Sequence, residues 1–189
     1  MARTVNGPRV GLVMGSESDR AVVEEACRVL DDFGVGYEVA VRSAHRTPEA
    51  AAQWAQSAKS RGLEVVIAAA GGAAHLAGAM AAHTGLPVLG IPLASSPLGG
   101  FDALLATVQM PPGVPVGTLG VGSWGARNAA HLAVRILALG DATLAGRLEA
   151  HRERLAGGAG APPASGGGRK NGARSTSGRR AKSAARGRS

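Results

Sequence analysis

Short apolar runs alternate with longer amphipathic patterns along most of the chain, and this alternation constrains the fold more than any other feature. Runs with the length and composition of buried strands occupy residues 10–14, 37–42, 65–69, 88–91 and 116–121. Helical patterns follow them: one ending at Gly34, then residues 48–61, 73–83, 101–108, 122–139 and 142–155. Strands separated by helices in this way predict an α/β fold with a parallel, doubly wound sheet that is covered by helices on both faces.

Loops follow the first three predicted strands, and we call them the first loop (residues 15–19), the second loop (43–48) and the third loop (70–75). The carboxyl ends of parallel strands meet at one edge of the sheet, where open α/β proteins bind their ligands. We therefore expect the three loops to converge on one pocket.

The second loop holds the densest group of reactive side chains. Arg46 can hold a phosphate bidentately, Ser43 can donate a hydroxyl hydrogen bond, and His45 can exchange a proton near neutral pH. Thr47 and Pro48 suit the N-cap and the first position of the following helix. Taken alone, this loop could equally be an inert capped turn whose His and Arg are solvated.

Glycines mark the first and third loops as candidate anion sites. Gly15 permits a tight turn before a helix N-terminus, although neither a Walker A sequence nor the three-glycine dinucleotide fingerprint is present. Ser16 and Asp19 could instead form a capping box. Gly71 and Gly72 would let a ligand approach the backbone, or would simply let helix and strand pack closely.

The other histidines and the cysteine are weaker candidates. His75, on an alanine-rich helix, could be a hydrogen-bonded structural residue, and His131 shares a polar stripe with Asn128 and Arg135, which favours a solvated role. The spacing of histidines and carboxylates predicts no metal site, and the one cysteine, Cys27, excludes an intrachain disulfide.

Charge is distributed unevenly along the chain. Eight of the 21 Lys and Arg residues lie in 157–189, which contains no Asp or Glu, so the other 13 balance the 13 acidic residues. We expect a flexible N-terminus over 1–8, one domain over 9–156 and a disordered basic Gly/Ala/Ser/Arg-rich tail over 157–189. The tail could contact nucleic-acid phosphates, but a solvated tail without a partner is the simpler interpretation, which we favour.

The start of the chain and its apolar runs predict a cytoplasmic protein without a membrane segment. Residues 1–9 lack the apolar core of a signal peptide. No apolar run approaches the ~20 residues that a membrane-spanning helix needs.

Read together, the loops resemble a single family. The segments Val-Met-Gly-Ser-Glu-Ser-Asp (13–19), Ser-Ala-His-Arg-Thr-Pro (43–48), Ala-Gly-Gly-Ala-Ala-His-Leu (70–76) and Val-Gln-Met-Pro-Pro-Gly-Val-Pro-Val-Gly-Thr-Leu (108–119) closely resemble motifs of the N5-carboxyaminoimidazole ribonucleotide mutase family of purine biosynthesis. The resemblance runs in order over residues 9–156. It implies a flavodoxin-like three-layer αβα sandwich, a homo-octamer, and neither a metal nor an organic cofactor.

The same resemblance implies an isomerase acting on a small ribonucleotide in IMP biosynthesis. The reaction would convert N5-carboxyaminoimidazole ribonucleotide to 4-carboxy-5-aminoimidazole ribonucleotide by decarboxylation and recarboxylation in a closed pocket. Carried over position by position, the general acid and base is His45. Substrate binding is assigned to positions in all three loops: Ser16, Asp19, Ser43, Arg46, Gly71, Gly72 and Ala73, to which we add the neighbouring His75.

Two departures and three alternatives stay open. Glu17 is a charged residue within the first loop, and we expect its side chain to face outward. Residues 95–100 form a Gly- and Pro-bearing version of a loop that we expect to border the site. The alternatives are a carboxylase that takes free aminoimidazole ribonucleotide and CO2, a non-catalytic mononucleotide-binding module that would not need His45, and a nucleic-acid-binding protein that uses the tail. The sequence of the third loop favours the mutase.

Overall fold

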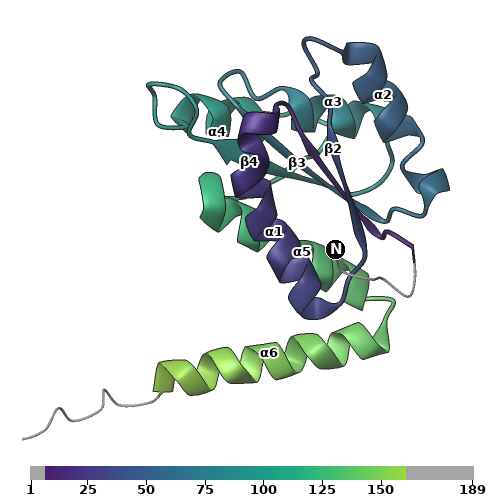
Figure 1. Cartoon of the computed structure of the whole chain (residues 1–189), viewed down its shortest axis with the longest axis vertical. Coiled ribbons are helices and arrows are strands. Elements are labelled where there is room, and N and C mark those ends of the chain that lie inside the picture. Colours follow the sequence, from purple (N-terminus) through teal and green to yellow (C-terminus); the bar gives the residue numbers. More distant parts are fainter. Residues whose placement is uncertain (1–6, 161–189) are drawn as a thin grey trace, which may run out of the picture.

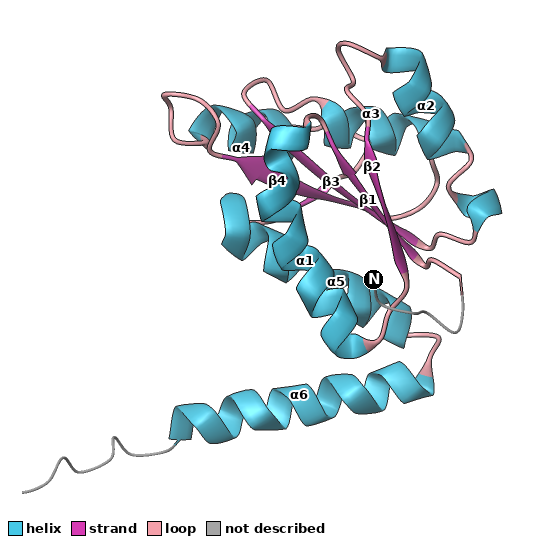
Figure 2. Cartoon of the chain, viewed as in Figure 1, coloured by secondary structure: helices cyan, strands magenta, loops and turns pink. Residues whose placement is uncertain are grey.

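The fold is built on a parallel five-stranded sheet in the order β2-β1-β3-β4-β5 (Figures 1 and 2). This computed structural model describes residues 7–160, with side-chain burial to residue 157. The strands are β1 (Val10–Met14), β2 (Tyr37–Val41), β3 (Val65–Gly71), β4 (Val88–Leu93) and β5 (Gly117–Thr118). The predicted parallel, doubly wound sheet is thus confirmed, and its strand order is that of flavodoxin-like folds.

Helices cover both faces of this sheet. On one face lie α1 (Arg20–Phe33) and α5 (Gly122–Ala138); on the other lie α2 (Pro48–Gln56), α3 (Leu76–His83) and α4 (Phe101–Val108) (Figure 1). Neighbouring strand residues serve opposite layers, since Leu12 packs with α1 and α5 whereas Val13 packs with α2 and α3. Because both faces are covered, every residue of β1 is buried, which explains its uninterrupted apolar sequence.

The last helix, α6 (Ala142–Gly160), continues past the end of the sheet in Figure 1. Asp141 starts it by accepting a hydrogen bond from the Leu144 amide at 3.0 Å, and Asp141 also pairs with Arg9 at 2.8 Å. Arg147 donates to the Phe33 carbonyl at the end of α1 (2.7 Å), so the first half of α6 is held against the body.

A missing side chain in β1 lets the α2 layer approach the sheet closely. A Cβ atom on Gly11 would lie 2.7 Å from Leu63 and 2.8 Å from the Trp54 ring. Any larger residue at position 11 would therefore push α2 away from the strand.

Element boundaries differ from the sequence-based predictions at several places. The strand expected at 116–121 pairs with β4 only at Gly117 and Thr118, and α2 ends at Gln56, before a short 3-10 turn that closes at Gly62 with φ +90°. Helix α3 begins at Leu76, three residues later than expected, because residues 72–74 form a turn in which Gly72 and Ala74 have φ of +60° and +41°.

Helix α3 is only partly buried in the single chain. Leu76, Ala77 and Met80 are buried, while Ala82 and His83 are exposed. Among residues 7–160, no helix is long and apolar enough to cross a membrane. The expectation of a flexible N-terminus falls mostly, and that of a disordered tail almost wholly, outside the described residues.

Candidate active site

A cavity of about 350 Å³ lies at the carboxyl edge of the sheet, where the three predicted loops meet. The chain leaves β1 toward β2 on one side and returns to β3 on the other, so the cavity sits at the switch point of the sheet, a usual ligand position. Seven of the predicted site residues line it: Ser16, Asp19, Ser43, His45, Arg46, Gly71 and His75. Gly72 and Ala73 belong to the third loop but are not part of the lining.

The first loop folds as a capping box and also faces the cavity. The Ser16 amide donates to the Asp19 carboxylate at 3.2 Å, and the Ser18 amide donates to the Ser16 hydroxyl at 3.4 Å. Burial raises the pKa of Asp19, while the hydrogen bonds from Ser16 and Ser18 and the positive charge of Arg46 act in the opposite direction. Ser16 and Asp19 therefore form the predicted capping box and also line the cavity.

The second loop is fastened to the first by Arg46. Its Nη2 donates to the Gly15 carbonyl at 2.8 Å, and its backbone amide donates to the Ser43 hydroxyl at 3.1 Å. The guanidinium has further N–H groups, so it can hold this bond and still contact an anion in the cavity.

The predicted cap at Thr47 is wrong in its detail. Helix α2 does begin at Pro48, but the Thr47 side chain makes no cap hydrogen bond to the helix. Instead, its Oγ1 donates to the Ser43 carbonyl and accepts from the Ser43 amide, each at 3.2 Å. Thr47 therefore closes the second loop on itself and keeps Ser43 in place.

His45 and His75 meet at the cavity, although 30 residues separate them in sequence. Nε2 of His45 lies 2.8 Å from Nδ1 of His75, and the rings are nearly perpendicular at 84°. In this hydrogen bond one nitrogen carries the hydrogen and the other accepts it, and the tautomers of the two rings decide which ring donates. Both rings are exposed, and a bound substrate can reach them.

The third loop carries backbone strain next to the cavity. Ala74 has φ +41°, a left-handed conformation that costs a non-glycine residue on the order of 1 kcal/mol or more. The Ala74 amide donates to the Gly71 carbonyl at 3.2 Å, which closes the turn before α3. This turn directs His75 toward His45.

Several lining residues were not among the predicted site residues. Ala44, Ala70, Ala74 and Leu76 add apolar wall, and Ser18 adds a hydroxyl group. Ser95 adds another hydroxyl group, from the loop at 95–100 that was expected to border the site. Ser95 follows β4, so a fourth strand end contributes to the same edge. The rule that placed the first three loops there applied equally to Ser95. Within residues 7–160, no group of three or more His, Cys, Asp or Glu side chains is arranged to hold a metal ion.

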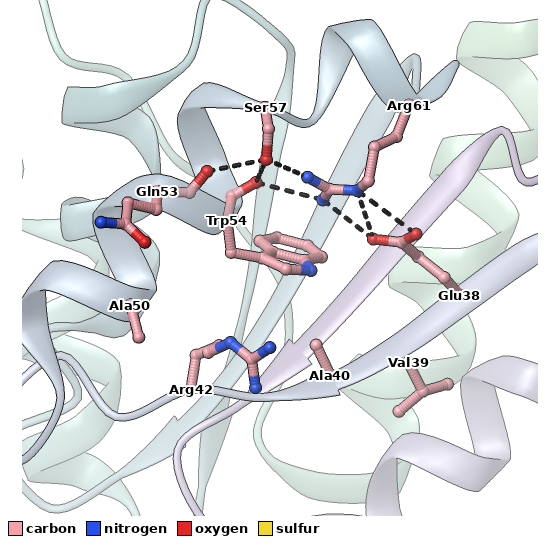
Figure 3. Close-up of a pocket in the computed structure, with 9 residues that line it drawn as sticks. All are labelled: Glu38, Val39, Ala40, Arg42, Ala50, Gln53, Trp54, Ser57 and Arg61. Carbon is pink, nitrogen blue, oxygen red and sulfur yellow. Dashed lines mark hydrogen bonds and ion pairs between the residues drawn. The ribbon is translucent and has the colours of Figure 1, made fainter.

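A second cavity, of about 450 Å³, lies between β2 and α2 (Figure 3). Figure 3 shows Arg61 beside Glu38 and Trp54. Its guanidinium pairs with Glu38 at 2.9 Å, donates to the Trp54 carbonyl at 3.1 Å, and lies 5.0 Å from the centroid of the Trp54 ring. Glu38 and the Trp54 carbonyl are thus both hydrogen-bond partners of Arg61, and none of the described residues that line the cavity is a histidine. We interpret these contacts as the attachment of α2 to the edge of the sheet.

The polar stripe around His131 predicted a solvated side chain, but the structure shows one that is only partly exposed. It is half-buried among α1, α5 and α6, with its ring 5.7 Å from Phe33 and 5.0 Å from His151. Burial lowers the pKa of His131, and the positive charges of His151 and Arg135 lower it further, while Asp32 acts in the opposite direction.

Comparison with known proteins gives a consistent result. A model of the family described as AIR carboxylase matches residues 9–157. The N5-carboxyaminoimidazole ribonucleotide mutase of Pyrococcus abyssi is 52% identical over 151 residues, which cover 80% of this chain and 86% of that protein. The mutase of Bacillus subtilis is 51% identical over 146 residues, covering 77% and 90%.

Similarity of structure agrees with similarity of sequence. The crystal structure of Treponema denticola PurE superimposes with a TM-score of 0.73 and 27% identity, covering 80% of this chain and 94% of that one. The match of sequence and fold together shows that this chain belongs to the AIR carboxylase family.

Proposed function

We propose that this protein is an isomerase that converts N5-carboxyaminoimidazole ribonucleotide to 4-carboxy-5-aminoimidazole ribonucleotide in purine biosynthesis. The observation that carries this proposal is the cavity where His45, Arg46 and the third loop meet, in a chain about half identical to proteins named as this mutase. The relatives' names supply the reaction, and the cavity supplies groups suited to each part of it.

The phosphate end of the substrate is assigned to the first two loops. Arg46 supplies a fixed positive charge, and Ser43 and Ser16 supply hydroxyl groups beside it. Asp19 accepts hydrogen bonds and is placed to bind the ribose or to hold the first loop in shape. Binding energy gained here would keep the imidazole ring fixed while its bonds change.

His45 is proposed to move the proton. In the first half of the reaction the bond between the exocyclic nitrogen and the carboxylate carbon breaks, the electron pair stays on nitrogen, and His45 delivers a proton there. In the second half the ring carbon attacks the CO2 that was released, and His45 removes the proton which that carbon loses. One imidazole can serve both halves, because it ends the first step ready to accept the proton of the second. The hydrogen bond to His75 would hold the ring in one tautomer and orientation.

The backbone of residues 71–73 is proposed to border the migrating carboxylate. Gly71 lines the cavity, while Gly72 and Ala73 shape the turn that carries the loop back to His75. Loss of CO2 to solvent would leave the reaction unfinished, so a closed pocket is part of the proposal.

An octamer is proposed from the family resemblance, and the surface of α4 supports assembly of some kind. Four large apolar side chains are exposed along α4 and the loop before it: Leu98 at 66%, Phe101 at 63%, Leu105 at 43% and Val108 at 50%. The spacing of Phe101, Leu105 and Val108 places these three along one side of the helix. Clustered apolar exposure of this kind marks contact surfaces between proteins.

We also propose that residues 9–156 form the functional unit and that this unit needs no cofactor. We propose that the protein acts in the cytoplasm, and its single cysteine supports this location.

The test is turnover with two substrates supplied separately to the purified protein. The proposal expects product from N5-carboxyaminoimidazole ribonucleotide. Turnover of only the free aminoimidazole ribonucleotide with CO2 would establish the carboxylase instead. Binding of ribonucleotide without any turnover would establish a non-catalytic module.

A further inference from the structure

Ser95 reaches the cavity from the end of β4, a strand end that the proposed function has not used. In the sheet, Gly71 at the end of β3 pairs with Leu93 at the end of β4. Ser95 lies two residues further along and folds back over Gly71. A Cβ atom on Gly71 would lie 1.8 Å from the Ser95 hydroxyl oxygen and 2.9 Å from its Cβ. The space beside Gly71 is therefore already occupied by the Ser95 hydroxyl group.

The two neighbouring serines of this loop have different environments. The Ser96 hydroxyl accepts a hydrogen bond from the Leu98 amide at 3.1 Å, and the Ser96 carbonyl accepts from the Gly99 amide at 3.1 Å, so Ser96 shapes the turn. Ser95 lines the cavity, and its hydroxyl makes no hydrogen bond to another residue in the part of the chain that the structure describes. Its donor is free to serve a ligand.

We propose that Ser95 binds the migrating carboxylate, by donating a hydrogen bond from its hydroxyl to a carboxylate oxygen. This inference rests on the proposed function, because it uses the placement of the carboxylate beside Gly71. The carboxylate is an acceptor both on the exocyclic nitrogen of the substrate and on the ring carbon of the product. A donor at this point holds it in both states and stays beside the released CO2 between them. The free aminoimidazole ribonucleotide has no carboxylate and therefore does not accept this hydrogen bond from Ser95.

The test compares Ser95→Ala with the matched control Ser96→Ala, each measured against two ligands. Hydrogen bonds to charged groups contribute enough to change affinity by about tenfold or more, and the exposed position of Ser95 favours the lower end. Ser95→Ala is therefore expected to weaken binding of 4-carboxy-5-aminoimidazole ribonucleotide about tenfold, while binding of the free aminoimidazole ribonucleotide changes less than about twofold. Ser96→Ala is expected to leave the ratio of the two affinities unchanged.

Turnover gives a second readout of the same contact. In single turnovers of N5-carboxyaminoimidazole ribonucleotide, Ser95→Ala should release a larger share of the substrate as free aminoimidazole ribonucleotide and CO2 than the unmodified protein does. A loop distorted by the substitution would weaken both ligands alike, and that outcome overturns the proposal. An unchanged affinity ratio with an unchanged share of released CO2 overturns it as well. Failure of the proposed function looks different, because the unmodified protein would then form no product at all.

Discussion

Replacing His45 with asparagine is expected to stop turnover while leaving the fold and ligand binding nearly intact. The imidazole is exposed, and its side-chain hydrogen bond among residues 7–160 is the one to His75 at 2.8 Å. Losing one exposed hydrogen bond should lower the free energy of unfolding by no more than about 1 kcal/mol. Removing a general acid and base lowers the rate by about 10² to 10⁴. That range corresponds to about 3–5 kcal/mol of transition-state free energy.

His75→Asn is the matched control, because it removes the other ring of the same hydrogen bond. If His75 only orients His45, the rate should fall about tenfold or less, the effect of one hydrogen bond. The assays are the rate of product formation from N5-carboxyaminoimidazole ribonucleotide, product affinity by calorimetry, and urea unfolding of each variant. Both variants should bind the product within a few-fold of the unmodified protein.

Two results would refute this reasoning. Turnover by His45→Asn at the unmodified rate would remove His45 from the chemistry. A loss of 10² or more in His75→Asn, with a smaller loss in His45→Asn, would show that the proton carrier is the other ring.

Three further substitutions and one truncation test other parts of the account. Gly71→Ala should reduce turnover more than stability, because its Cβ would displace the Ser95 hydroxyl at the rim of the cavity; a rate near that of the unmodified protein would show that this space is not needed. Arg46→Lys should raise KM about tenfold with kcat less affected, since lysine cannot hold a phosphate bidentately; an unchanged KM would contradict the phosphate assignment. Because burial lowers the pKa of His131 from its ordinary 6.5, the unfolded chain binds more protons below pH 6.5, and stability should fall as the pH drops through 6.5. The free energy of unfolding is measured in urea at pH values on both sides of 6.5, and it should depend less on pH in His131→Gln than in the unmodified protein. The same pH dependence in both proteins would exclude His131 as its source. Truncation after Ala156 should leave activity and assembly unchanged, whereas a large loss of either would assign the tail a role.

The sheet could be predicted from the sequence because its strands are buried on both faces. β1 was predicted over its observed range, since all five residues are apolar and buried. β5 was predicted over six residues and pairs over two. Apolar residues such as Val116 and Leu119 do pack against the two cores there, but apolar character reports burial and not whether a backbone pairs with its neighbour.

The candidate site was predictable in its loops and not in its contacts. The rule that loops at strand carboxyl ends converge brought the second and third loops together correctly. The pairing of His45 with His75 depends on the left-handed turn at Ala74. This turn could not be predicted from the sequence, because alanine rarely adopts a left-handed conformation. Thr47 was a plausible cap, yet its hydroxyl bonds to the backbone of Ser43 and not to the amides of the helix.

The central claim is that the carboxylate moves within the pocket of this protein, and one measurement tests it most directly. The purified protein is given N5-carboxyaminoimidazole ribonucleotide that carries an isotopic label in its carboxylate, in buffer with unlabelled bicarbonate. The account predicts that 4-carboxy-5-aminoimidazole ribonucleotide forms with the label retained. Product without the label, or product formed only from free aminoimidazole ribonucleotide and bicarbonate, would contradict it.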